Sequence, residues 1–434
     1  MEHHSNQTSW LETIAQVVVV PPDENGLVSV NNFREALLQH DPSKSRMKIA
    51  AITACSNVTG IATPYHEIAQ LMHEFDGFCF VDFASSFAYV SVDMHPANRD
   101  GSQSLDAIFF SPHKLLGGPG TTGIVIFSRS LYNLSVPSNV GGGIVLWTNP
   151  WGQHRFYSHS EVEAREDAGT PAYLQLIRTA LAVTLKERMD PQMMAIREAE
   201  MNRIVFSELV PDTNSRIDDN VDLKSFSSFQ KRAKDGEIFI MGGHVRERLS
   251  IFSFVVAGLH HSLMVTLLND RFGIQARGGC SCAGTYGHYL FDVADDAGKR
   301  TSKLMTDAID RGDHTTKYGW TRISLHPIMT DDEVRFVCRS IKQVAANHRA
   351  WGSDYIYQPS HGRFEAYQRL TSYLPEAATS ELFRVWRISR KTEKSMSGNH
   401  ISTTFIRFIS RTRIMTAAID LHLLLQYVHL AVVL

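Results

Sequence analysis

Short apolar runs alternate with amphipathic stretches through the first half of the chain. Apolar runs predict strands at residues 17–20, 48–53, 78–84, 107–110 and 124–127. Residues 32–39, with Asn31 as N-cap, and residues 66–75 carry apolar side chains at helical spacing. Strands separated by helices indicate βαβ units and a largely parallel sheet. In such sheets ligands bind at the carboxyl ends of the strands.

The second half has a different pattern. Residues 141–171 are irregular, and two helical stretches follow at 173–189 and 193–209. Further strands are predicted at 249–256, 274–276 and 321–325, with a helix at 261–272 and a capping box at 330–333 that opens a helix to about residue 348. Periodicity is lost beyond residue 350. We therefore predict an α/β fold with a large domain at 1–188, a smaller α+β domain at 189–350 and an irregular tail at 351–434.

Composition and charge narrow the class of protein. The chain has 434 residues, of which 43% are hydrophobic, and a net charge of −2. This length is sufficient for two or more domains with ample core, and a charge so near zero argues against a nucleic-acid binder. The five cysteines are odd in number and sparse, which favours a reducing compartment over a disulfide framework. One residue separates Cys280 from Cys282, whereas two to four residues usually separate the paired cysteines of a zinc site. We therefore expect no metal.

The two ends of the sequence bear on location. Residues 1–5 have neither the basic nor the apolar region of a secretory signal, so we expect the cytoplasm or an organelle matrix. Residues 416–434 form an apolar tail of nearly membrane-spanning length, but Asp420, His422, Gln426 and His429 interrupt it. An amphipathic tail is therefore favoured over a membrane anchor, and both interpretations stay open.

Lys114 is the most informative candidate for chemistry. It follows the apolar run 107–110, and Asp82 ends the run 78–82. A desolvated lysine can form a Schiff base with an aldehyde, and an acid can keep a pyridine nitrogen protonated, so this pair is suited to pyridoxal phosphate. Asn57 also lies just beyond a strand end, which predicts one shared site. The alternative is that Lys114 is an ordinary surface lysine and Asp82 a strand-end turn residue.

Seven segments in order strengthen this interpretation. Together they resemble the class V aminotransferase family of fold-type-I pyridoxal phosphate enzymes, and among these the group-II cysteine desulfurases and selenocysteine lyases. The resemblance covers about the first three-quarters of the chain and implies a mostly parallel large-domain sheet with helices on both faces. The segments are Glu2-His3-His4-Ser5-Asn6, Ser56-Asn57-Val58-Thr59-Gly60, Val81-Asp82-Phe83-Ala84-Ser85, Ser111-Pro112-His113-Lys114, Arg165-Glu166-Asp167-Ala168-Gly169-Thr170-Pro171, Arg277-Gly278-Gly279-Cys280-Ser281-Cys282-Ala283 and Trp320-Thr321-Arg322-Ile323-Ser324.

The resemblance assigns cofactor contacts residue by residue. It implies that Lys114 forms the Schiff base, that Asp82 pairs with the pyridine nitrogen and that His3 stacks on the ring. It also implies that Ser111 and His113 bind the phosphate, for which neutral or cationic donors are suitable. Two alternatives stay open for His3, a catalytic ring contact and a frayed N-terminal position.

The resemblance also assigns substrate contacts. It implies that Asn57 and Arg322 take the α-carboxylate of an amino-acid substrate, with Arg277 nearby; the alternative for Arg322 is a surface ion pair. Ser85 stands where the family usually has a glutamine that contacts the ring oxygen, so that contact is expected to be lost or mediated by water.

Cys282 falls five residues after Arg277, where the group-II desulfurases carry their persulfide-forming cysteine. Such a role requires an exposed position and an activated thiolate. The alternative is a small buried thiol that packs behind a glycine turn, and Cys280 is an equally near rival.

The family's glycine/threonine turn, which holds the cofactor phosphate at a helix N-terminus, would precede the Glu2-His3-His4 motif and is absent. We therefore expect an N-terminally truncated member with weak or absent cofactor binding. The segment from Arg165 to Pro171 implies a homodimer. The expected function is cysteine desulfurase-like. The alternatives are a class V transaminase or other lyase without a catalytic cysteine, or an impaired fragment that acts only as a binding or dimerising module.

Overall fold

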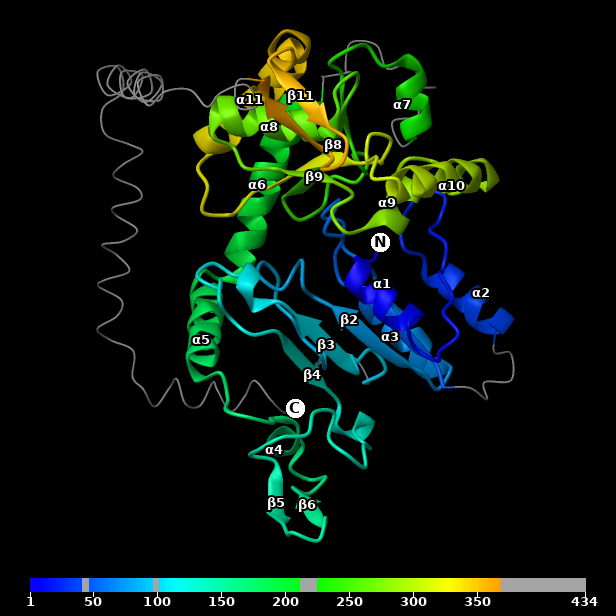
Figure 1. Cartoon of the computed structure of the whole chain (residues 1–434), viewed down its shortest axis with the longest axis vertical. Coiled ribbons are helices and arrows are strands. Elements are labelled where there is room, and N and C mark those ends of the chain that lie inside the picture. The colour runs from blue at the N-terminus through cyan, green and yellow to red at the C-terminus, as the bar shows by residue number, and fades with distance from the viewer. Residues whose placement is uncertain (41–46, 97–100, 211–224, 368–434) are drawn as a thin grey trace, which may run out of the picture.

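The computed structural model describes residues 1–40, 47–96, 101–210 and 225–367, which form two lobes connected by a long helix (Figure 1). The first lobe contains a four-stranded sheet in the order β1-β2-β3-β4. Its strands are β1 (Ile49–Thr53), β2 (Phe78–Asp82), β3 (Ala107–Phe110) and β4 (Ile124–Phe127).

The sheet of the first lobe is only partly parallel, which corrects the expectation of a mostly parallel sheet. β1, β2 and β3 are parallel neighbours, whereas β4 runs antiparallel to β3. The connection from β3 to β4 holds the short 3-10 turn η1 (Pro112–Lys114) and no α-helix. Parallel neighbours are joined through a crossover, usually a helix, and a chain that returns without one pairs antiparallel.

Helix α3 (Tyr65–Glu74) packs against β1 and β2 through the apolar face that its sequence predicts. Helix α2 (Val30–His40) covers α3 and begins one residue before the expected cap, so Asn31 lies within the helix. Residues 17–20 form no strand, although the run is β-branched. Val18 and Val19 are exposed there, because no neighbouring strand pairs with this segment.

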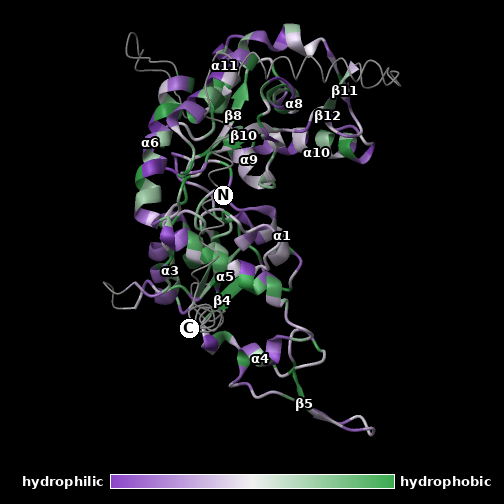
Figure 2. Ribbon diagram, turned by 90° about the vertical axis from the view of Figure 1, so that its left-hand side faces the viewer, coloured by the Kyte–Doolittle hydropathy of each residue, from purple (hydrophilic) through white to green (hydrophobic). Residues whose placement is uncertain are grey.

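The irregular stretch 141–171 forms most of an arm that projects from the first lobe (Figures 1 and 2). The arm consists of η2 (Arg129–Leu131), the hairpin β5 (Val145–Thr148) and β6 (His154–Phe156), and the short helix α4 (Val162–Glu166). Large apolar side chains of the hairpin lie exposed, among them Trp147 and Trp151. Helix α5 (Tyr173–Arg188) leads back to the first lobe, where it contacts η1.

Helix α6 (Pro191–Leu209) connects the lobes, and its buried face joins the core of the second lobe. That lobe is built on an antiparallel sheet in the order β7-β8-β10-β9. Its strands are β7 (Ile238–Ile240), β8 (Ile251–Val256), β9 (Arg277–Gly279) and β10 (Trp320–Ser324). β9 thus begins just after the predicted strand at 274–276.

Helices α8 (His261–Phe272) and α11 (Asp331–Gly352) supply much of the second core. The predicted capping box is confirmed, because Thr330 and Glu333 hydrogen bond reciprocally at the start of α11. A hairpin follows where the sequence shows no periodicity. The remaining elements are α1 (His4–Leu11), α7 (Phe226–Arg232), α9 (Gly284–Leu290), α10 (Asp296–Asp310), β11 (Tyr355–Gln358) and β12 (Arg363–Ala366).

The domain limits at residues 188 and 350 stay predictions. Among the described residues, no helix is long and apolar enough to cross a membrane. The apolar tail at 416–434 lies outside the described residues.

Candidate active site

A pocket of about 580 Å³ opens beside the carboxyl ends of the parallel strands. Thr53, Asp82 and Phe109 are register partners on β1, β2 and β3, so the sheet itself brings these three residues to one edge. Six of the residues that the sequence singles out line this pocket: His3, Asn57, Asp82, Ser85, Ser111 and Lys114. The expected convergence of Asn57, Asp82 and Lys114 at one edge is therefore present.

Lys114 ends η1 and its side chain is open to the pocket, while the protein around it displaces much of the bulk water. This desolvation lowers the pKa of the lysine, and the positive charges of Arg322 and Arg277 lower it further. The Asp82 carboxylate and the Cys282 thiolate act in the opposite direction. An amine whose neutral form is favoured in this way is suited to attack a carbonyl.

Asp82 is 6% exposed and ends β2. The Ala84 N–H donates to its Oδ1 at 2.8 Å, and no described residue donates a hydrogen bond to Oδ2. Burial raises the pKa of this carboxyl, and the Ala84 hydrogen bond and the Lys114 charge counteract the rise. Asp82 therefore retains an acceptor oxygen for a cationic donor.

His3 caps α1, with its Nδ1 accepting the Ser5 N–H at 3.1 Å. Partial burial lowers the pKa of His3, and the charge of Lys114 adds to the effect. The imidazole is thus held neutral beside the lysine. Trp10, one turn of α1 beyond Asn6, lines the same pocket.

Residues of the second lobe lie next to this pocket. The Arg277 guanidinium donates from Nη2 to the Cys282 Sγ at 2.8 Å. Arg322 donates from Nη1 to the Asn57 backbone carbonyl at 2.9 Å, and Asn57 donates from Nδ2 to the Ser281 carbonyl at 2.8 Å. The two lobes therefore meet through backbone and side-chain hydrogen bonds at the site itself.

Asn57 carries an unsatisfied group. Its Oδ1 is buried and has no hydrogen-bond partner among the described residues, while its amide nitrogen is engaged by Ser281. An acceptor left unpaired in this way costs free energy unless a ligand or water supplies a donor. As placed here, the amide donor of Asn57 is taken by Ser281, whereas the resemblance implies a donor to a carboxylate.

The predicted phosphate ligands are separated. Ser111 lines the pocket, but His113 is exposed and is not among the lining residues. Ser85 also lines the pocket, and its hydroxyl donates to the Cys55 carbonyl at 2.5 Å. Ser85 therefore keeps only its oxygen lone pairs for a further contact.

Glu2 connects α1 to the end of β1 beside the pocket, although the sequence shows it only as part of a motif. Thr53 N–H donates to Glu2 Oε1 at 2.9 Å, and Asn6 Nδ2 donates to Oε2 at 2.6 Å. Burial raises the pKa of Glu2, and the Asp82 charge contributes in the same direction. Glu2 thereby fixes the start of α1 against the end of β1. The one available signal was its place directly before His3.

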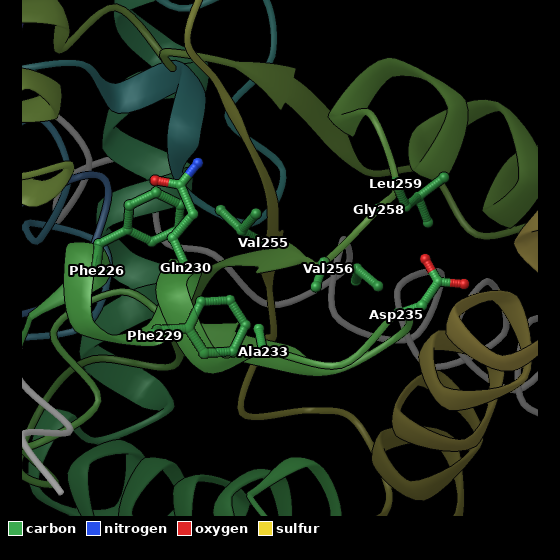
Figure 3. A pocket seen from close by; sticks show the side chains of 10 residues that line it. Phe226, Phe229, Gln230, Ala233, Asp235, Val255, Val256, Gly258 and Leu259 are labelled. Atoms are coloured by element: carbon green, nitrogen blue, oxygen red, sulfur yellow. The ribbon is translucent and has the colours of Figure 1, made fainter.

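A second pocket, of about 410 Å³, lies in the second lobe beside α7 and β8 (Figure 3). The rings of Phe226 and Phe229 stand on one side and Asp235 at the opposite end. The Asp235 carboxylate already accepts the Arg349 Nε–H at 2.6 Å, which lowers its pKa. None of the residues predicted for catalysis lines this pocket.

Comparison with known proteins assigns the chain to a family of enzymes. The profile of the Aminotransferase class-V family matches residues 1–237, so the chain belongs to that family. Membership implies pyridoxal phosphate as the cofactor.

Curated relatives are named as desulfurases. A probable cysteine desulfurase of Vibrio cholerae is 28% identical over 298 residues, which cover 67% of this chain and 62% of the relative. A cysteine desulfurase of an Enterobacter species is 27% identical over 65% of this chain and 60% of its own length. The chain thus spans about three-fifths of the length of these relatives.

Solved structures show the same fold. A cysteine desulfurase of Escherichia coli aligns with a TM-score of 0.58 and 22% identity, over 80% of this chain and 70% of that one. The apo cysteine desulfurase of Thermococcus onnurineus aligns with a TM-score of 0.59 and 17% identity, over 80% and 71%. The fold is accordingly fold type I, with the partly parallel sheet described above.

Proposed function

We propose that this chain is a pyridoxal phosphate-dependent enzyme that acts on an amino acid with cysteine desulfurase-like chemistry. One observation carries the proposal: Lys114, Asp82 and His3 line a single pocket, and the Arg277–Cys282 pair lies close enough to alter the pKa of that lysine. The curated relatives named as cysteine desulfurases support the same assignment.

The residues of the pocket fit the ring of the cofactor. Lys114 would hold its aldehyde covalently, the free Oδ2 of Asp82 would accept from the ring nitrogen, and His3 would lie against the ring. When bound, the cofactor supplies an electron sink at the substrate Cα.

The fit to the phosphate is poorer. Ser111 is in place, whereas His113 lies outside the lining. We therefore expect weak affinity, so that cofactor must be supplied in excess.

Cys282 is the proposed sulfur acceptor. The Arg277 guanidinium offers its thiolate a charge-assisted hydrogen bond, and the side chain is partly exposed. Its thiolate would attack the sulfur of a substrate cysteine, so that the C–S bond breaks and alanine is the other product. Arg322 would bind the substrate carboxylate, because the Arg277 guanidinium is already hydrogen bonded to Cys282. Burial and the positive charge of Arg277 lower the pKa of Arg322.

A second function is favoured by the arm. Leu146, Trp147 and Trp151 are 60%, 50% and 82% exposed, which is unusual for large apolar side chains of a monomer. Members of this family are typically homodimers, and a chain with poor phosphate binding could serve as a dimerising module alone. A homodimer is part of both proposals.

The test supplies the full chain with excess pyridoxal phosphate and L-cysteine and measures alanine and sulfide. We expect both products from the parent chain and neither from Lys114→Ala. Cys282→Ala should lose sulfur transfer; if alanine and sulfide persist, the nucleophile is another residue. A dimer that binds no cofactor would favour the module over the enzyme.

A further inference from the structure

Cys280 and Cys282 belong to one tight turn between β9 and α9. The Ala283 N–H donates to the Cys280 carbonyl at 2.9 Å, which closes the turn. Its two central residues, Ser281 and Cys282, have φ of +51° and +58°. Such positions favour glycine or asparagine, so two successive side chains of other types impose strain.

The turn keeps this conformation because neighbouring elements hold it from several sides. The Cys282 carbonyl accepts the His4 N–H at 2.7 Å, and the Ser281 carbonyl accepts the Asn57 amide at 2.8 Å. The Trp320 indole donates to the Ser281 hydroxyl at 3.2 Å. Strain that the surroundings enforce in this way is typical of functional sites.

The two thiols of this turn differ from the other cysteines. Cys55, Cys79 and Cys338 are buried, and burial raises the pKa of each, to about 12 for Cys79 and Cys338. Cys280 and Cys282 are both partly exposed. They also differ from each other, because Cys282 faces Arg277 while Cys280 packs at the edge of an apolar cluster.

We infer that Cys280 is a resolving thiol for sulfur carried on Cys282, an inference that rests on the proposed function. Two residues in an extended chain span about 7 Å, and the turn shortens that span. A disulfide requires Cα atoms roughly 4.4–6.8 Å apart, and the span of this turn is compatible with that requirement. The Cys280 side chain must turn from the apolar cluster toward Cys282 for the bond to form. Cys280 is thus assigned a role in the same reaction as Cys282.

The resolving step balances without an added oxidant or reductant. The Cys280 thiolate attacks the inner sulfur of the Cys282 persulfide. An S–S bond forms between the two cysteines while the bond to the outer sulfur breaks, and the electron pair leaves with that sulfur as hydrosulfide. The proton of the Cys280 thiol is released to water or to the hydrosulfide. The sulfane sulfur is reduced and the Cys280 thiol oxidised. A dithiol reductant is then needed to return both cysteines to thiols.

The experiment is a single turnover of the full chain, loaded with excess pyridoxal phosphate, with L-cysteine under anaerobic conditions and without a thiol reductant. Trypsin releases one peptide, residues 278–299, that holds both cysteines. For the parent chain we expect alanine, an equivalent amount of sulfide and a peptide lighter by two hydrogens. Cys280→Ser should form alanine but retain a peptide heavier by one sulfur, with sulfide released only after a dithiol is added.

The outcomes separate this inference from the proposed function. Alanine with a persulfide that persists on the parent chain overturns the resolving role and leaves the function standing. Absence of alanine contradicts the function instead. In that case inorganic polysulfide, added to the full chain, supplies the sulfane sulfur directly. A disulfide that forms in the parent chain but not in Cys280→Ser or Cys282→Ser supports the inference, and a stable persulfide in the parent chain refutes it.

Discussion

The pocket at the carboxyl edge of β1–β3 and the pocket beside α7 have comparable volumes, about 580 and about 410 Å³, and contrasting chemistry. In the first, Asp82 keeps a free carboxylate oxygen and Asn57 an unpaired buried one. In the second, the carboxylate of Asp235 is already neutralised by Arg349. Volume alone therefore does not distinguish a site from a packing void, whereas the set of ionisable side chains that line the first pocket does.

The difference originates in the backbone. The first pocket lies where parallel strands end, so residues distant in sequence deliver lysine, acid and histidine to one place. The second lies beside the antiparallel pair β7–β8 and the helix α7, which contributes the rings of Phe226 and Phe229. The variants below test this contrast.

Replacing Lys114 with alanine should have the largest effect, because the pocket then lacks its nucleophilic amine. We expect complete loss of the visible absorbance band that develops with excess pyridoxal phosphate, and of alanine formation. The matched control is Lys186→Met. Lys186 is also partly desolvated, which lowers its pKa, but it lies over the Phe87 ring and does not line the pocket. Equal loss in both variants would contradict the special role of Lys114.

Phe229→Ala should affect stability and not cofactor capture. Phe229 is 3% exposed and packs against Phe226 and Phe239 in the second lobe. Removing a buried phenylalanine ring costs about 3–5 kcal/mol of unfolding free energy. Urea titration measures the loss, and absorbance with excess pyridoxal phosphate should be unchanged in the folded protein. A folded variant that no longer captures the cofactor would assign the second pocket a functional part.

Glu198 tests whether a shifted pKa alone marks a site. It lies on α6 outside both pockets, and burial raises its pKa to about 7. Because the folded value exceeds the unfolded one of 4.5, its contribution to stability is complete below pH 4.5 and is lost as pH rises through 7. The shift corresponds to about 3 kcal/mol.

Glu198→Gln should remove that dependence, so that unfolding free energy stays flatter between pH 4.5 and 7 and exceeds that of the parent above pH 7. Cofactor capture should not change. An unaltered pH profile of stability would show that this carboxyl does not titrate as described.

Asp82→Asn should leave capture by Lys114 in place but slow turnover. The amide cannot supply the negative charge that holds a proton on the ring nitrogen. A hydrogen bond to a charged group is worth about 1.5–3 kcal/mol, so alanine formation should fall about 10- to 100-fold. Steady-state rates at saturating cofactor measure this; an unchanged rate would remove Asp82 from the proposed site.

The sequence predicts the parts of this site that depend on strand ends and local motifs. Lys114 and Asp82 follow apolar runs that are strands, and the capping box at Thr330 is local chemistry. The sequence does not reveal that β4 runs antiparallel to β3, because the path of the connection between the two strands decides the direction of pairing. Equally, no pattern in the sequence shows that Glu2 bonds to the end of β1 or that Ser281 and Cys282 adopt positive φ, since both follow from tertiary contacts.

We propose that the first pocket directs one lysine of this chain, Lys114, toward an aldehyde. The most direct measurement is to mix the full chain with excess pyridoxal phosphate, reduce with borohydride and map the modified lysines by mass spectrometry. We expect the pyridoxyl group to be concentrated on Lys114. Labelling spread evenly over exposed lysines such as Lys299, with Lys114 unreacted, would contradict it.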